Sequence, residues 1–193
     1  IESSRVLAVH GQILPSTVAN VKLSAQLSDG NTIQGESKIT EYGGQIERLS
    51  IHPSDVKAYG PSVDAILEAQ MIIIGPGSLY TSILPNLCVP GISEALNEST
   101  AQKVYVCNVA TQEGETSGYS VADHLEAIQR HTSNSLINFV IANSDVNSDQ
   151  TKSTTHPVIN DERPLVNAVL ERSDLVDPDY PLRHDRKRLA EAI

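Results

Sequence analysis

The sequence predicts an α/β protein with a Rossmann-like parallel sheet, helices on both faces of that sheet, and a small antiparallel β insertion near the N-terminus. Three observations support this class. Short apolar runs alternate with helical stretches, a β-hairpin signal occurs early, and polar or glycine-bearing segments follow each apolar run. Strands that alternate with helices through short connections are typical of a parallel sheet covered by helices.

The length of 193 residues suits one ordinary domain. The sequence opens on Ile1 and its only Met is Met71, so we expect it to be part of a longer protein. We interpret 1–193 as a single α/β domain with three parts: a β-rich insertion at 11–51, a parallel-sheet core at 53–143, and a loop and C-terminal tail at 144–193.

The insertion is predicted from its two-residue periodicity. Apolar and polar side chains alternate over 17–28 and again over 46–51, as in half-exposed strands. An Asp-Gly pair at 29–30 is a strong hairpin signal, so 31–39 is interpreted as the returning strand. A further short strand is predicted over 5–10.

The core is predicted from uninterrupted apolar runs separated by helical patterns. Such runs are typical of buried parallel strands, and we place strands at 71–75, 104–107 and 136–142. Apolar side chains three and four residues apart predict helices at 63–69, 91–101 and 119–130.

In the tail we expect a polar loop at 144–156, a helix at 162–171 that starts at Pro164, an extended stretch at 175–182, and a final helix at 184–193.

Composition excludes several classes of function. The net charge is −10 and no basic stripe is present, so we expect no nucleic-acid partner and no anionic membrane partner. No apolar run reaches the roughly 18 residues of a membrane span and no secretory signal is visible, so the cytoplasm is the expected location. Cys88 and Cys107 are interpreted as buried free thiols, and no His/Cys cluster has metal-ligand spacing, so we predict no metal site.

The candidate site lies in the segments that follow the three apolar strands. Ligands of open parallel sheets bind outside the carboxyl ends of the strands, so we expect these segments to meet at one edge. The segments are 75–82 (GPGSLYTS), 108–116 (NVATQEGET) and 143–145 (NSD).

The first segment has the chemistry of an anion-binding turn. Gly75 and Gly77 leave room for backbone N–H groups to approach a ligand, and Pro76 fixes its own φ. A helix that starts here would favour a phosphate or carboxylate at its N-terminus. The segment is neither a P-loop nor a G-x-G-x-x-G motif. The alternative is a tight strand-to-helix turn, capped by Ser78, that binds nothing.

The second segment offers amide, hydroxyl and carboxylate groups around a bend at Gly114. Its side chains would read a base or a sugar, and Glu115 is a candidate general base or metal ligand. The alternative is that Glu113 and Glu115 are solvated loop charges. His124 is interpreted as a packing or surface residue, and the basic cluster at 183–188 as either a phosphate contact or a solvated helix face.

These segments resemble one known family. The strings at 72–87 (IIIGPGSLYTSILPNL), 108–116, 119–128 (YSVADHLEAI) and 182–185 (LRHD), together with 11–37, are similar to the gluconeogenesis-factor family of bacteria. That family is related to the archaeal 2-phospho-L-lactate transferases of deazaflavin-coenzyme synthesis. Its members also open with a glycine-rich strand-turn-helix that this sequence lacks.

The resemblance implies a Rossmann-like fold and a set of ligand-side residues. In the first turn they are Gly75, Pro76, Gly77, Ser78, Tyr80, Thr81 and Ser82. In the second turn they are Asn108, Thr111, Gln112, Gly114, Glu115 and Thr116, and the late arginine is Arg183.

The resemblance also implies a function. It implies a regulator that binds a nucleotide or nucleotide sugar, of the UDP-N-acetylglucosamine type, with links to carbon metabolism, cell-wall synthesis and cell shape, and a homodimer is plausible. The alternatives are a phospholactate-type transferase, in which Mg²⁺ would be the cofactor, and an interaction module whose glycine turns are only structural.

Overall fold

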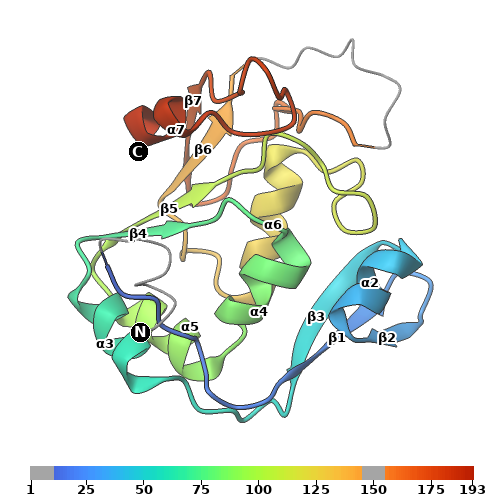
Figure 1. The fold of residues 1–193 in the computed structure, drawn as a ribbon, viewed down its shortest axis with the longest axis vertical. Coiled ribbons are helices and arrows are strands. Elements are labelled where there is room, and N and C mark those ends of the chain that lie inside the picture. The colour runs from blue at the N-terminus through green and yellow to red at the C-terminus, as the bar shows by residue number, and fades with distance from the viewer. Residues whose placement is uncertain (1–10, 145–154) are drawn as a thin grey trace.

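The computed structural model describes residues 11–144 and 155–193. It contains a four-stranded parallel sheet in the order β4-β5-β6-β7 and a three-stranded antiparallel sheet in the order β2-β1-β3. Figure 1 shows the two sheets at opposite ends of the molecule, with helices α4 and α6 between them. The predicted α/β class, with a parallel sheet and an antiparallel insertion, is confirmed. The strand predicted at 5–10 lies outside the described residues.

The insertion is built from the strands β1 (Lys22–Leu27), β2 (Thr32–Gln34) and β3 (Ile46–His52). The hairpin predicted at 29–30 joins β1 to β2, and Asp29 accepts a hydrogen bond from the backbone N–H of Asn31. The predicted alternation is also present, because Leu23, Ala25 and Leu27 are buried in the main hydrophobic core.

The returning strand predicted at 31–39 is wrong beyond Gln34. Gly35 has a φ of 99° and ends the strand, and residues Glu36–Tyr42 form the short helix α2. Gly43, with a φ of 70°, ends that helix. These glycines allow backbone conformations that other residues rarely adopt, so the chain turns within the segment that the hairpin signal predicts to be one returning strand.

The parallel-sheet core follows the predicted order of strands and helices. Its elements are α3 (Gly60–Glu68), β4 (Met71–Ile74), α5 (Pro90–Glu98), β5 (Gln102–Val106), α6 (Val121–His131) and β6 (Phe139–Asn143). Helix α6 begins at a capping box, in which the Ser120 hydroxyl and the Asp123 carboxylate each bind the other residue's backbone N–H. Helix α3 begins at Gly60, earlier than predicted.

The helix predicted at 162–171 is wrong, because residues Val169–Ser173 form β7, the fourth parallel strand. Pro164 led to the prediction of a helix start. In the structure Arg163, the residue before it, forms ion pairs with Asp123 and Asp161. Asn167 has a φ of 58°, which breaks any helical run. The stretch predicted as extended at 175–182 contains a turn instead, in which the Tyr180 N–H donates to the Asp177 carbonyl.

Helices cover both faces of the parallel sheet, as predicted. Ile74, Tyr105 and Val140 point into the main core, which the helices α4, α5 and α6 complete. On the other face, Val104 and Ile141 pack with Leu175 against the final helix α7 (Arg186–Ala192). In the part of the chain that the structure describes, no helix is long and apolar enough to span a bilayer.

Candidate functional site

The first predicted turn leaves the sheet at Gly75, directly after β4. Gly75 has a φ of 84°, and a Cβ at this position would lie 2.9 Å from the carbonyl oxygen of Val106 on β5. A side chain is therefore excluded by both the backbone conformation and the neighbouring strand. After Ser78 the chain enters a π-helical turn, Leu79–Ile83, and then α4 (Leu84–Leu87).

The first and second turns are joined by a reciprocal pair of hydrogen bonds. The Gly77 N–H donates to Oδ1 of Asn108 over 3.2 Å, and Nδ2 of Asn108 donates to the Gly77 carbonyl over 2.9 Å. This pair brings the ends of β4 and β5 together, as the topology predicts. There is space beside the Cα of Gly77, because an added Cβ would meet only Ile83 and Ser82, each at 3.8 Å.

A cavity of about 510 Å³ opens where the two turns meet. Its wall combines backbone, hydroxyl, amide and imidazole groups, which bind sugar hydroxyls or phosphate oxygens, with the carboxylate of Glu113, which binds hydroxyls. The residues on which the argument depends are Gly77, Ser78, Asn108, Thr111, Gln112 and His184. The first five of these are among the residues predicted from the sequence.

Glu115 lies behind this wall rather than in it, with 3% of its surface exposed. Its carboxylate accepts hydrogen bonds from the Tyr80 backbone N–H (3.0 Å), the Thr81 hydroxyl (2.6 Å) and the Gln112 amide (3.2 Å). The hydroxyl of Thr40 on α2 approaches the same carboxylate at 3.4 Å. Glu115 therefore fastens the first turn, the second turn and the insertion to one another.

Several other predicted ligand residues also lie in the supporting structure. Tyr80 is fully buried and donates its hydroxyl to the Ile46 carbonyl, and its oxygen lies 2.8 Å from the hydroxyl of Tyr119. The Thr116 hydroxyl accepts from the Gln112 N–H. Gly114 packs against α2. Pro76 and Ser82 belong to the first turn and its π-helical continuation, outside the groups that line the cavity.

His184 also lines the cavity, and the sequence indicates it only as part of the basic cluster at 183–188, a phosphate contact or a solvated helix face. Its Nε2 lies 3.2 Å from the carbonyl oxygen of Cys107. A carbonyl only accepts, so Nε2 carries the proton, and in the neutral ring Nδ1 then has a lone pair. Burial lowers the pKa of His184, which favours that neutral form. The LRHD string contains His184, but the family resemblance assigns a ligand-side role only to the arginine of that string.

Arg183, the neighbour of His184, is exposed and lies outside both turns. Its guanidinium stands over the ring of Tyr180, 5.4 Å from the centroid. Of the third predicted segment, 143–145, Asp145 lies outside the described residues, and Asn143 is not part of the wall of this cavity. Asn143 ends β6 and accepts from the Leu175 N–H through Oδ1, and it lines a second, neighbouring cavity.

The remaining polar candidates are structural in this arrangement. His124 is fully buried in α6, with Nδ1 2.8 Å from the Ser120 carbonyl, which agrees with its interpretation as a packing residue. Cys88 and Cys107 are free thiols, the first partly buried and the second fully buried. Within residues 11–144 and 155–193, no three His, Cys, Asp or Glu side chains are grouped to hold a metal ion.

These features define a Rossmann-like α/β protein with a polar cavity at the carboxyl edge of its sheet. A family model described as 2-phospho-L-lactate transferase CofD matches residues 1–175. A gluconeogenesis factor of Halalkalibacterium halodurans is 42% identical over the whole chain, and one of Bacillus subtilis is also 42% identical. The crystal structure of a UPF0052 family protein from Bacillus halodurans superposes on the whole chain with a TM-score of 0.92 and 42% identity.

The chain belongs to the gluconeogenesis-factor family and carries a CofD-like domain. It spans 62% and 63% of the two curated relatives and 65% of the crystallised protein. The resemblance inferred from the two turns is therefore confirmed, and the roles of individual residues toward a ligand stay predictions.

Proposed function

We propose that this protein binds a nucleotide sugar of the UDP-N-acetylglucosamine type and acts as a regulator rather than as a catalyst. The observation that carries the proposal is the cavity of about 510 Å³ at the Gly77–Asn108 junction. Its position outside the carboxyl ends of β4 and β5 is the usual ligand position in open α/β sheets. Its volume lies in the range typical of small-molecule sites, about 300–1,000 Å³.

The chemistry of the wall suits a sugar attached to a phosphate. Ser78 contributes a hydroxyl, Gln112 an amide, and His184 an imidazole nitrogen with a lone pair. These groups can pair with sugar hydroxyls and with an acetamido group, whereas the Thr111 hydroxyl is already paired with the backbone of His156. Gly77 lets the ligand approach the backbone closely, and Arg183 is the nearby cation that we assign to the phosphates.

The regulatory role is supported by how Glu115, the candidate general base that the sequence indicates, is used; Glu113, the other acidic residue of the second turn, lines the cavity. Glu115 is saturated with hydrogen bonds from Tyr80, Thr81 and Gln112, and it is buried. A general base must reach the proton that it removes. We include in the proposal the links to carbon metabolism, cell-wall synthesis and cell shape that the sequence resemblance implies.

The test is calorimetric titration of the protein with UDP-N-acetylglucosamine and, separately, with GDP. We expect saturable binding of the uridine sugar without turnover. Gly77→Val should weaken that binding by more than about tenfold, which corresponds to about 1.4 kcal/mol, because its side chain enters the cavity. The fold should persist, since a Cβ at Gly77 would meet nothing closer than 3.8 Å and the backbone does not need a positive φ there.

Gly60→Val is the matched control, because a Cβ at Gly60 also meets nothing within 4 Å and the residue lies on α3, away from the cavity. If the wild-type protein and the Gly77 variant bind the uridine sugar with equal affinity, the ligand does not bind in this cavity. A loss of binding in both glycine variants would indicate a general effect on folding.

A second candidate function is favoured by one observation, the match of residues 1–175 to the transferase family model. In this reading the protein moves a phospholactyl-type group onto a hydroxyl acceptor, and Mg²⁺ is the expected ion. A preference for GDP over the uridine sugar, together with metal-dependent turnover of a deazaflavin acceptor, would support it over the regulator.

A further inference from the structure

A second cavity lies beside the candidate site, at the carboxyl ends of β6 and β7. It measures about 230 Å³ and shares Val109 and Leu182 with the larger cavity. Because the same two residues line both cavities, the cavities are next to each other, at the distance at which two ends of one extended ligand could lie. The smaller cavity is below the range of about 300–1,000 Å³ that holds a whole drug-sized ligand, so it suits a single ring.

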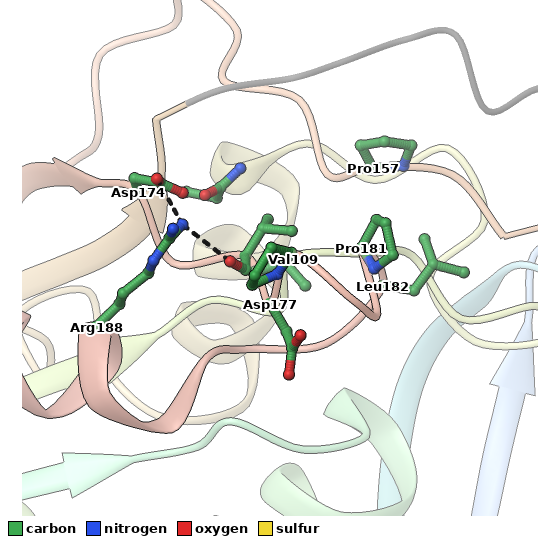
Figure 2. Close-up of a pocket in the computed structure, with 10 residues that line it drawn as sticks. Val109, Pro157, Asp174, Asp177, Pro181, Leu182 and Arg188 are labelled. Atoms are coloured by element: carbon green, nitrogen blue, oxygen red, sulfur yellow. Dashed lines mark hydrogen bonds and ion pairs between the residues drawn. The ribbon is translucent and has the colours of Figure 1, made fainter.

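The walls of this cavity differ from end to end. Pro157, Pro181 and Leu182 form one apolar side in Figure 2, and Asp174 and Arg188 lie together on the opposite side. Val176 adds to the apolar lining. The cavity therefore combines stiff apolar walls with a charged, hydrogen-bonding end.

The charged end is held in place by α7. Arg188 Nη1 forms an ion pair with Asp174 and also donates to the Val176 carbonyl over 3.0 Å. Helix α7 itself begins at Asp185, whose carboxylate accepts from the backbone N–H groups of Lys187 and Arg188. A guanidinium and a carboxylate fixed side by side present both donors and an acceptor to the edge of a ring.

We propose that this proline-walled pocket binds the nucleobase of the ligand, while the sugar end occupies the cavity at Gly77. The inference rests on the proposed function, because it assigns the two ends of that same nucleotide sugar. A base is flat and apolar on both faces, so proline, valine and leucine walls desolvate it favourably. Its donors and acceptors lie along its edges, where Asp174 and Arg188 stand.

A sugar fits this pocket poorly. Its hydroxyls point in several directions, and those that face Pro157, Pro181 and Val176 would lose water without gaining a partner. The hydrogen-bonding groups of the pocket, Asn143, Asp174, Asp177 and Arg188, could pair only with the hydroxyls that face them. The polar wall of the larger cavity, with Ser78 and Gln112, supplies those partners. The two cavities thus differ in the way that the two ends of a nucleotide sugar differ.

The test compares three probes on the same protein: UDP-N-acetylglucosamine, UDP, and N-acetylglucosamine 1-phosphate, which lacks the base. Pro181→Asp places a carboxylate in the apolar wall of the smaller cavity alone, and Val176→Phe fills that cavity from a second position. Each variant should weaken binding of the two uridine nucleotides by about tenfold or more and leave the base-free sugar phosphate unchanged. Pro164→Asp, at an exposed proline outside both cavities, is the matched control.

Methyl NMR supplies a readout that does not depend on a variant that folds. UDP should shift the methyl signals of Val176 and Leu182 through the ring current of the base, whereas the base-free sugar phosphate should leave Val176 unshifted. If the wild-type protein binds UDP but neither variant changes its affinity, the pocket assignment is overturned and the proposed function stands. If the wild-type protein binds none of the probes, the pocket assignment and the proposed function are both wrong. If the two variants lose binding of the base-free sugar phosphate but still bind the uridine nucleotides, the ligand lies in the opposite orientation to the one that we propose.

Discussion

Glu115 is the residue on which the geometry of both turns depends. It is one buried carboxylate with three close donors from three different residues, Tyr80, Thr81 and Gln112. Acceptors of this kind are costly to remove, because each donor left behind stays buried and unpaired. The sequence predicts Glu115 as a ligand or catalytic residue, and the structure shows it as the residue that positions the others.

We therefore predict that Glu115→Gln lowers the free energy of unfolding by about 1–3 kcal/mol, the cost of leaving a buried hydrogen-bonding group unsatisfied. The amide nitrogen of glutamine would face donors rather than accept from them. Chemical denaturation followed by circular dichroism measures the change. Glu68→Gln, on the exposed end of α3, is the control and should have no effect. An unchanged stability for Glu115→Gln would mean that the three donors find other partners.

His184 shows why a residue-level prediction fails when the partner is distant in sequence. Its ring is oriented by the carbonyl of Cys107, which lies 77 positions earlier. Nothing within the LRHD string reveals that contact. Gly77 and Asn108 were predictable because each directly follows a strand, and the ends of neighbouring parallel strands lie together.

At the scale of elements, the insertion is attached to the site by close backbone contact. A Cβ on Gly114 would lie 2.2 Å from the carbonyl oxygen of Thr40 on α2, and Gly114 has a φ of 80°. Gly118, four residues later, has a similar φ of 75° but has nothing within 4 Å. Substitutions at Gly118 and at Gly114 therefore distinguish the stability lost through the left-handed backbone conformation from the stability lost through the contact with Thr40.

We predict that Gly118→Ala costs about 1–2 kcal/mol of stability, the price of a left-handed backbone with a side chain. Gly114→Ala should cost a further 1–3 kcal/mol or so, because α2 must move away from the second turn. Thermal unfolding of the two variants measures the difference. Equal losses would show that α2 moves without cost and that the insertion is only loosely coupled to the site.

A histidine joins the same insertion to helix α6. Nε2 of His131 accepts from the Leu49 N–H on β3 over 2.8 Å, and Nδ1 donates to the Ala127 carbonyl over 2.7 Å. This arrangement requires the neutral ring. Burial lowers the pKa of His131 below its usual 6.5, and the nearby Arg130 and Arg48 lower it further.

The folded protein therefore binds fewer protons than the unfolded chain at mildly acidic pH. The contribution of His131 to stability is fully present above about pH 6.5, the usual pKa of histidine, and is lost as the pH falls toward the lowered value. We predict that the free energy of unfolding decreases from pH 7.5 to 5, and that His131→Gln makes this decrease shallower. His124 and His184 also have lowered pKa values, so some dependence remains.

His52→Gln is the control for this experiment, since His52 is exposed on β3. A pH dependence that is the same in the wild-type protein and in the His131 variant would contradict the role assigned to this hydrogen bond.

The two elements that the sequence mispredicts illustrate how tertiary contacts override local pattern. Residues 36–42 contain few apolar side chains and only Ile39 is buried. Neither the two-residue period of a strand nor the 3.6-residue period of a helix is therefore evident in this segment. Strand β7 exists because it extends the sheet beside β6, where it gains a ladder of backbone hydrogen bonds. The strands β4, β5 and β6 were predictable because short uninterrupted apolar runs are typical of parallel strands. The run of β4 is nevertheless less buried than predicted, because Met71 and Ile73 are each 46% exposed.

At the scale of the whole molecule, one edge of the parallel sheet is uncovered. Strand β4 pairs only with β5 among the described strands. Ile72 and Ile74 belong to the main core, whereas Met71 and Ile73, on the opposite face, are each 46% exposed. Parallel strands are normally covered on both faces, and an apolar edge strand is a template for pairing with another chain.

We predict that a protein made of these 193 residues self-associates through this edge as its concentration rises. Ile73→Lys should shift the distribution toward the monomer, because a lysine on the exposed face is unfavourable in an apolar contact. Sedimentation velocity over a range of concentrations measures the change. Val18→Lys is the control, since Val18 is 78% exposed and lies outside the sheet.

A monomer at every concentration, or an equal effect of both lysines, would exclude β4 as the contact. The relatives are longer than this chain, which spans 62% and 63% of two of them. In a longer protein that supplies a strand beside β4, Ile73 would be buried within one molecule. Ile73→Lys should then lower the stability of the monomer instead of dissociating an oligomer, so the same substitution distinguishes the two uses of this edge.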